Sequence, residues 1–258
     1  MEKCSKRNPV KNLVSKILYA DFHFRYGTNM LDTSVIRILS GLLAIILFVS
    51  YILFFGAFTR KKQDPGSVRA SKPTGFILMN VWLLLGSLPI IFYVLGGAVP
   101  GLVYGTPLNL SFYGADFLQL FSVFLVLFAP IIFLWSARVL GQYMRPEIEV
   151  REKHELVTRG PYSHIRHPTY TGTLLVDLGA TLLFLNIILV LGFLARVAIS
   201  YKRAVLEEEL LSSPDGFGES YKQYMQGTGR FLPKLTRRRT PPASRNTESK
   251  LSGRIQAG

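Results

Sequence analysis

The sequence predicts an all-α integral membrane protein with about five transmembrane helices, the last two paired as a tilted hairpin. Of its 258 residues, 49% are apolar and only 18% are charged, and the mean hydropathy is +0.28. A chain of this composition is too apolar for most soluble domains. Its apolar residues also gather in runs long enough to cross a hydrocarbon core of about 30 Å.

Three apolar runs in the first part of the chain each have the length of a single span. They cover residues 35–59, 74–99 and 116–141. Pro89 and Pro130 lie inside the second and third runs, where neighbouring helices can cover the freed backbone groups, and Pro130 predicts a kink. Residues 96–115 contain no Lys or Arg. Under the positive-inside rule this segment is the predicted outside loop.

Residues 172–201 form an apolar stretch of about 30 residues, too long for one span and short for two. An interruption near Asn186 predicts a hairpin of two tilted helices with both ends cytoplasmic. Asp177 and Arg196 lie nine residues before and ten after Asn186, and therefore at nearly equal depth. Because a charge at bilayer depth costs roughly 2.5–3.5 kcal/mol, we predict that they pair directly or through a shared polar partner. In the alternative, Arg196 serves the cytoplasmic site and Asp177 pairs with a tyrosine or asparagine.

The two ends of the chain are basic and account for part of the net charge of +14. We predict that residues 1–34 form an interfacial segment that is not cleaved, and that residues 234–258 form a disordered basic tail. The basic residues lie in loops and tails, which favours anionic lipid head groups as partners and argues against nucleic acid. Five spans with the carboxyl terminus inside would put the basic amino terminus outside, against the positive-inside rule.

One polar stretch, residues 154–172, separates the third run from the hairpin. It contains three of the four histidines, His154, His164 and His167. Pro161 and Pro168 fix φ and disfavour helix in the residues before them, so the chain should turn twice. Such a segment is typical of a functional site, although an ordinary basic loop on the membrane surface is the alternative.

The motifs in and after this stretch resemble the isoprenylcysteine carboxyl methyltransferase family. They are His154-x-Leu-Val-Thr-x-Gly-Pro-Tyr162, then Arg166-His-Pro-x-Tyr170-x-Gly172, and later Arg203-x-x-x-Glu207-Glu208. The resemblance covers residues 138–233 and implies a membrane enzyme that uses S-adenosylmethionine; the wider superfamily includes phospholipid N-methyltransferases. It implies a methyltransferase core over residues 116–233. The two spans and outside loop of residues 35–115 match no motif.

The resemblance also implies roles for particular residues. The cytoplasmic cofactor site would form from the loop before the hairpin and the helix after it, with contacts from His154, Glu155, Leu156, Val157, Tyr162, His167, Pro168, Thr169, Tyr170 and Glu207. Arg203 and His167 would be catalytic, and Arg203 would bind the acceptor's negative group. Family members often have glutamine where this chain has Glu147.

Spacing and composition support some of these roles independently. Arg203 and Glu207 are four residues apart and share a helix face, where an ordinary surface ion pair is the alternative. Residues 201–211 should continue the last helix beyond the bilayer, and residues 217–226 should form an amphipathic cap. We expect Glu208 to orient the helix and Glu209 to be solvated.

Several functions remain open at this point. S-adenosylmethionine needs an acid, hydrogen-bond donors and aromatic surface, which the motif region offers, and no Gly-x-Gly-x-x-Gly follows a strand, which excludes a Rossmann-type methyltransferase. We predict methylation of a lipid-like or prenylated acceptor from the bilayer, most favourably at an isoprenylcysteine-type carboxylate, which at a pKa of about 3.5 needs no base. A phospholipid amine, at about 10, would need His167 or a glutamate as base; a thiol acceptor is also open.

Other classes of protein remain as well. A membrane reductase using NADPH is one, since sterol reductases share a similar carboxyl-terminal region, and a non-catalytic scaffold is another. Zinc binding by the three histidines is disfavoured, because His167 precedes a proline and His164 has no helical register. The expected location is the cell membrane in a prokaryote or the endoplasmic reticulum in a eukaryote, with the site facing the cytoplasm.

Overall fold

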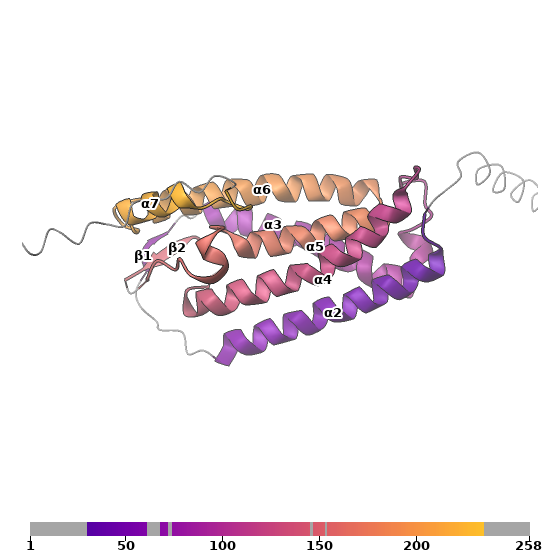
Figure 1. Ribbon diagram of the computed structural model, residues 1–258, viewed down its shortest axis with the longest axis horizontal. Coiled ribbons are helices and arrows are strands. Elements are labelled where there is room, and N and C mark those ends of the chain that lie inside the picture. Colours follow the sequence, from indigo (N-terminus) through magenta and orange to yellow (C-terminus); the bar gives the residue numbers. More distant parts are fainter. Residues whose placement is uncertain (1–29, 61–67, 72–73, 145–146, 153, 235–258) are drawn as a thin grey trace, which may run out of the picture.

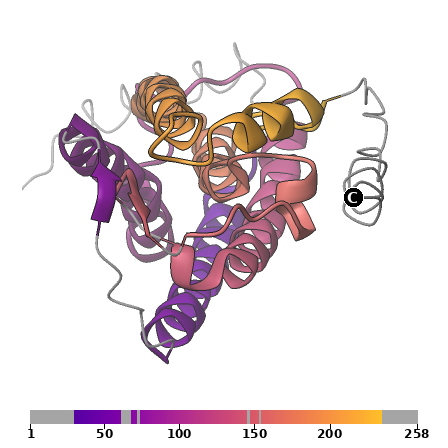
Figure 2. The same cartoon turned by 90° about the vertical axis from the view of Figure 1, so that its left-hand side faces the viewer.

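The computed structural model describes residues 30–60, 68–71, 74–144, 147–152 and 154–234. In this part of the chain, long helices run along one common axis, with a short helix and a strand pair at one end (Figure 1). The long helices are α2 (Thr33–Arg60), α3 (Thr74–Ala98), α4 (Ala115–Leu140), α5 (Pro168–Phe184) and α6 (Ile187–Leu211). Seen end-on, α5 lies among the others, consistent with its contacts to α3, α4 and α6 (Figure 2). The predicted interfacial segment and basic tail fall almost wholly outside the described residues.

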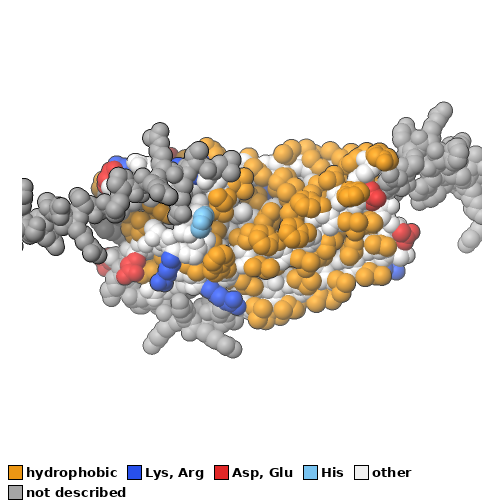
Figure 3. All heavy atoms as spheres, in the orientation of Figure 1, with side chains coloured by type: hydrophobic (Ala, Val, Ile, Leu, Met, Phe, Trp, Pro, Cys, Tyr) orange, Lys and Arg blue, Asp and Glu red, His pale blue; other side chains and the backbone are white. Residues whose placement is uncertain are grey.

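The three predicted spans of the first half are confirmed as helices α2, α3 and α4. They contain 28, 25 and 26 residues, and at about 1.5 Å per residue each exceeds the roughly 30 Å hydrocarbon core. Their outer faces carry large exposed apolar side chains, such as Ile38, Leu84 and Phe124. Hydrophobic side chains cover the middle of the visible face in Figure 3, and charged ones lie towards its two ends. By length and composition these three helices can cross a bilayer, so we describe a membrane protein.

The predicted hairpin is also confirmed, as helices α5 and α6. The turn between them is tight: Leu185 adopts a left-handed φ of 48° and Asn186 caps α6 by accepting a hydrogen bond from the Ile188 amide at 3.0 Å. Helix α6 continues to Leu211, as expected. Its buried side carries Arg196, Ser200, Arg203 and Glu208 at intervals of three to five residues. The number of spans contributed by this hairpin stays a prediction.

Helices α4 and α5 approach closely because two glycines on α5 face α4. A Cβ at Gly172 would lie 3.0 Å from the Phe133 Cβ, and one at Gly179 would lie 2.3 Å from a Val126 methyl. No larger residue fits at Gly179 without moving the helices apart. This contact fixes the start of α5, where the motif loop ends.

The predicted ion pair inside the hairpin is present. Arg196 Nε lies 3.3 Å from Asp177 Oδ2, and both side chains are about 5% exposed. The two atoms do not meet hydrogen-bond geometry, and neither has another hydrogen-bond partner in the described structure. We call these residues the buried pair; it is an ion contact rather than a hydrogen bond.

The expectation of a purely α-helical fold is wrong at one place. Strand β1 (Val68–Ser71) pairs antiparallel with β2 (Glu149–Arg151), with Ala70 opposite Val150 and Ser71 opposite Glu149. Strands of three or four residues are too short to produce a recognisable alternation, and their pairing joins segments some 80 residues apart. Helix α7 (Glu219–Gly227) forms the predicted cap, beginning two residues later than expected.

Candidate active site

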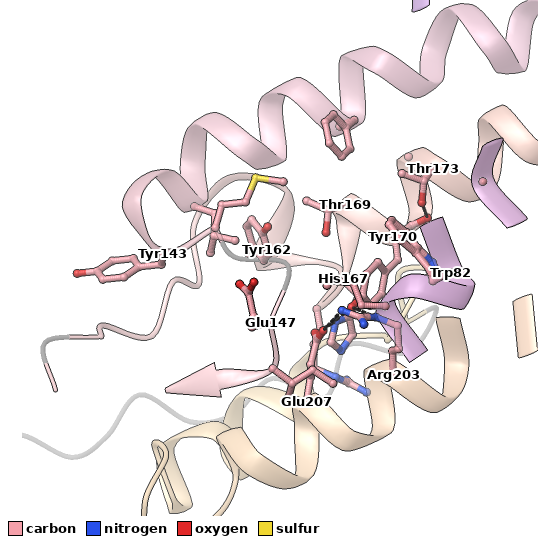
Figure 4. A pocket seen from close by; sticks show the side chains of 18 of the residues that line it. Trp82, Tyr143, Glu147, Tyr162, His167, Thr169, Tyr170, Thr173, Arg203 and Glu207 are labelled. Carbon is pink, nitrogen blue, oxygen red and sulfur yellow. Dashed lines mark hydrogen bonds and ion pairs between the residues drawn. The ribbon is translucent and has the colours of Figure 1, made fainter. Parts of the chain in front are cut away.

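A cavity of about 760 Å³ opens where the motif loop meets the helical bundle. Its walls come from the motif loop and from all five long helices. Figure 4 shows the part near the loop, where Tyr170 and His167 from the start of α5 lie beside Arg203 and Glu207 from α6. The cavity therefore joins a polar region to the apolar interior of the bundle.

The motif loop turns twice, as its prolines predict. Gly160 has a left-handed φ of 61° and begins a 3₁₀ turn, Gly160–Ser163, with Pro161 in its first positions. His167 precedes Pro168, the first residue of α5. The loop thus places His167 directly at the helix start, buried to 5% exposure.

The segment after α7 holds this loop in place through backbone hydrogen bonds. The amides of Arg166 and His167 donate to the carbonyls of Gly229 and Arg230 at 2.8 and 3.0 Å, and the Gly229 amide donates to the His164 carbonyl at 3.1 Å. The backbone at His167 is therefore held by residues more than 60 positions later in the chain.

His167 lies between two carboxylates. Its Nδ1 is 3.2 Å from Glu207 Oε2, and its Nε2 is 3.2 Å from Glu208 Oε1. Burial by itself disfavours the charged ring, but the hydrogen bonds and charges of Glu207 and Glu208 outweigh it and raise the pKa of His167. A ring with an acceptor at each nitrogen is best satisfied when both nitrogens carry a proton.

Glu208 connects His167 to two arginines. It accepts from Arg166 Nε at 2.8 Å and from Arg230 Nη2 at 2.6 Å. Although burial opposes ionisation, hydrogen bonds from His167, Arg230 and Arg166 lower the pKa of Glu208. Arg166, His167, Glu207, Glu208 and Arg230 are hereafter the carboxylate cluster. The expected orienting role of Glu208 agrees with this geometry.

Arg203 lies next to Glu207, and both residues line the cavity. The Tyr170 hydroxyl donates to Glu207 and accepts from Arg203 Nε at 3.1 Å. Arg203 Nη2 lies 3.8 Å from Glu207 Oε1, and Nη1 donates to the Gly75 carbonyl at 3.0 Å. With Arg203 only 3% exposed, this is not the surface ion pair that spacing alone allowed.

Aromatic rings line the end of the cavity nearest the loop. The imidazole of His154 stacks on Tyr143, with ring centroids 4.6 Å apart, and meets the edge of Phe217 at 5.3 Å. Burial lowers the pKa of His154, partly opposed by Glu149, which favours the neutral ring. The three histidines of the motif thus have three different surroundings, since His164 is exposed and contacts Ser163.

The structure brings nearly all predicted site residues to this one cavity. Those lining it are His154, Glu155, Leu156, Val157, Tyr162, His167, Thr169, Tyr170, Arg203 and Glu207. Pro168 does not line it but is buried as the first residue of α5. Glu147, at the position where family members often have glutamine, is exposed and lines the cavity as well.

Sequence reasoning missed Trp82, Arg230 and the Gly75 carbonyl. Trp82 on α3 lines the cavity and packs against the Tyr170 ring at 5.6 Å, while its Nε1 donates to Ser200 Oγ at 2.9 Å. These contacts join residues 88 and 118 positions apart, so no local spacing signals them. Arg230 lies beyond the motifs, and only its contact with Glu208 reveals it.

The fold and cavity define a helical membrane protein with a buried polar site at one end of the bundle. Residues 122–213 match the family described as the isoprenylcysteine carboxyl methyltransferase (ICMT) family. The resemblance expected from the motifs is therefore confirmed over this region.

Individual relatives agree with the family match. The chain is similar to protein-S-isoprenylcysteine O-methyltransferase of Dictyostelium discoideum, at 34% identity over 33% of this chain and 35% of the relative. The enzyme of the same name from Xenopus laevis is 36% identical over 33% of this chain and 29% of the relative. That from Schizosaccharomyces pombe is 33% identical over 36% and 45%. Each alignment spans less than half of the relative's length.

Proposed function

We propose that this protein is a membrane-embedded methyltransferase that uses S-adenosylmethionine to methylate the carboxylate of a lipid-like, isoprenylcysteine-type acceptor. The observation that carries the proposal is the continuity of one cavity from the polar motif loop to the apolar interior of the bundle. A cofactor with several charged groups and an acceptor from the bilayer can meet in such a cavity. Similarity to enzymes named as isoprenylcysteine O-methyltransferases supports the same reading.

The donor set at the loop end of the cavity fits S-adenosylmethionine chemically. The Tyr143 and His154 rings, stacked on each other and edged by Phe217, offer apolar and π surface for an adenine. Glu155 and Glu207 supply negative charge for an ammonium and a sulfonium. When bound, the cofactor supplies a methyl group already activated by the sulfonium.

The chain's own part is then to orient the acceptor and exclude water. Arg203 would hold the acceptor carboxylate, because its guanidinium is buried, lines the cavity and is fixed by Tyr170, Glu207 and Gly75. A planar guanidinium with several donors suits a carboxylate. Positioning of this kind accounts for much of the catalysis when neither reactant needs a proton moved.

The carboxylate cluster favours a carboxylate acceptor over an amine. His167 was one possible base for an amine, but Glu207 and Glu208 outweigh the effect of burial and raise its pKa, which favours the protonated ring. Hydrogen bonds and charge from His167 lower the pKa of Glu207 despite its burial, which makes it a weak base too. An acceptor carboxyl is already ionised near neutral pH and needs no base.

The proposed location is the cell membrane in a prokaryote or the endoplasmic reticulum membrane in a eukaryote, with the site on the cytoplasmic side. Anionic lipid head groups would contact the basic loops at this end.

Binding and product analysis test the proposal together. In detergent, S-adenosylhomocysteine should raise the unfolding midpoint and NADPH should not, since only a ligand of the native state shifts it. With a radiolabelled methyl donor and an S-alkylated N-acetylcysteine, the product should release its label as methanol in base, which an ester does and an N-methyl amine does not. Stabilisation by NADPH alone would support a reductase, and stabilisation by neither would support a scaffold.

A further inference from the structure

The cavity continues beyond Arg203 into the apolar part of the bundle. Met79, Trp82, Gly86 and Ile90 on α3 all line it, and at 1.5 Å per residue they span about 16 Å. The facing walls are mainly apolar: Leu47, Phe54, Pro130, Phe133 and Val176. An acceptor held by Arg203 would lay its tail along this deep half.

The buried pair interrupts this apolar wall. Asp177 and Arg196 both line the cavity, and Arg196 precedes Arg203 by seven residues on α6, about 10 Å deeper. Each is 4% exposed. A tail that extends along α6 beyond this distance passes the pair.

Arg196 is held firmly in this position. Its guanidinium carbon lies 3.9 Å from the Trp82 ring centroid, and its Nη1 donates to the Trp82 carbonyl. The guanidinium also occupies space above Gly86, where a Cβ would lie 1.8 Å from Nη1. Contacts with Trp82 and Asp177, and the space above Gly86, thus fix the position of the Arg196 guanidinium.

The polar groups of the pair are not fully satisfied. Arg196 Nε and Asp177 Oδ2 make no hydrogen bond in the described structure. Behind the pair, a void of about 10 Å³ lined by Leu85, Leu88 and Leu189 is at the lower limit for one water. By contrast, the wall hydroxyls of Ser50, Ser87 and Thr173 each donate to a carbonyl of their own helix.

We propose that Asp177, Arg196 and Trp82 form a polar subsite in the acceptor cavity, selecting an acceptor that carries an uncharged hydrogen-bonding group, such as a hydroxyl, about 10 Å from its methyl-accepting atom. The inference rests on the proposed function, because Arg203 sets the position of the reacting end. A wholly hydrocarbon tail would cover an ion pair and offer it no hydrogen bond. A hydroxyl can both accept from a guanidinium and donate to a carboxylate, and it adds no net charge to a neutral pair.

Three acceptors with the same cysteine carboxylate test the subsite on the full chain in detergent. One is S-dodecyl-N-acetylcysteine, the second carries a hydroxyl on the fifth alkyl carbon, about 10 Å from the carboxylate when extended, and the third carries it at the chain end. We expect kcat/KM for the second to exceed that of both others by roughly 10- to 100-fold, the range of one hydrogen bond to a charged group. Calorimetric binding of the three compounds gives the same comparison without turnover.

Two variants and one matched control locate the effect. In Asp177→Leu with Arg196→Met, apolar side chains of similar size replace both partners, which is often tolerated where a single change is not; the preference should disappear. Gly86→Ala should reduce it by displacing the guanidinium, whereas Gly192→Ala, the same change facing only a flexible Leu88 methyl at 3.1 Å, should not.

Equal use of the three acceptors by the unmodified protein, or a preference that survives in the double variant, overturns the subsite. S-adenosylhomocysteine binding separates this failure from failure of the proposed function. If the ligand binds and methyl transfer occurs without selectivity, only the subsite is wrong. If neither occurs, the enzyme assignment fails, and the subsite stands or falls on the calorimetric comparison.

Discussion

The carboxylate cluster and the buried pair both hold charge out of water, but they satisfy it to different degrees. In the cluster, each carboxylate oxygen of Glu207 and Glu208 has at least one charged or hydroxyl partner within 4 Å. In the buried pair, one 3.3 Å contact without hydrogen-bond geometry joins the two charges, and the Trp82 carbonyl and ring hold Arg196. Because each carboxylate of the cluster has several partners, removing one member should cost much stability. The two charges of the buried pair have fewer partners, so the pair can accept another hydrogen bond.

The two groups also differ in how the chain assembles them. Asp177 and Arg196 lie on consecutive helices that one tight turn brings together. The cluster joins the motif loop, the end of α6 and the segment after α7, so its contacts need this whole end of the bundle to be folded. Its loss should therefore loosen the site as well as lower stability.

Glu208→Gln should be the most damaging single change in the cluster. It leaves Arg166, His167 and Arg230 facing a neutral amide, and removal of one member of a buried charge group typically costs about 3–5 kcal/mol. Thermal unfolding in detergent measures this loss. Glu209→Gln, at the exposed next position, should stay within about 0.5 kcal/mol of the parent. Equal effects at both positions would mean that the cluster adds no stability.

Substitutions at the cavity face of the cluster should separate cofactor from acceptor binding. His167→Ala and Glu207→Ala should each weaken S-adenosylhomocysteine binding by about 100-fold or more without unfolding the protein. Arg203→Ala should change that affinity little but lower kcat/KM for the acceptor by about 100-fold, the usual effect of losing one charged positioning group. If Arg203→Ala mainly weakened S-adenosylhomocysteine binding and the other two changes mainly affected the acceptor, the two proposed roles would be exchanged.

The buried pair should show coupling when both partners are changed. Asp177→Asn and Arg196→Gln each leave one charge uncompensated, whereas the double variant leaves none. We expect the double variant to be more stable than the sum of single losses predicts, by about 1–2 kcal/mol. Melting of the three proteins in one detergent measures this difference. Strictly additive losses would show that the 3.3 Å contact contributes nothing.

The smallest effect should be a dependence of stability on pH through His167. Its pKa is raised in the folded state, so its contribution is fully present below the unfolded value of about 6.5 and is lost as pH rises through the folded pKa. The unfolding midpoint of the parent relative to His167→Gln should therefore fall as the pH rises above about 6.5. A relative midpoint that rises over this range would contradict a protonated ring between Glu207 and Glu208.

Much of the site could be predicted because its residues are close in sequence. Residues 154–157 and 162–170 lie in one short stretch, and the i to i+4 spacing of Arg203 and Glu207 already places them on one helix face. The depth of Asp177 and Arg196 followed from counting residues on either side of Asn186. In each case the covalent chain or one helix sets the distance.

The sequence by itself determined the apolar spans, the turn at Asn186 and the breaks at the two prolines, because these depend on hydrophobic length and on local backbone sterics. The tertiary structure alone decided that Trp82 lies beneath Arg196 and beside Tyr170, that Arg230 completes the carboxylate cluster, and that β1 pairs with β2. Those contacts join distant segments, and their geometry depends on how closely the helices pack, which for α4 and α5 is set by a glycine facing a valine methyl. No local pattern contains that information, since each partner is an ordinary residue until the other is brought to it.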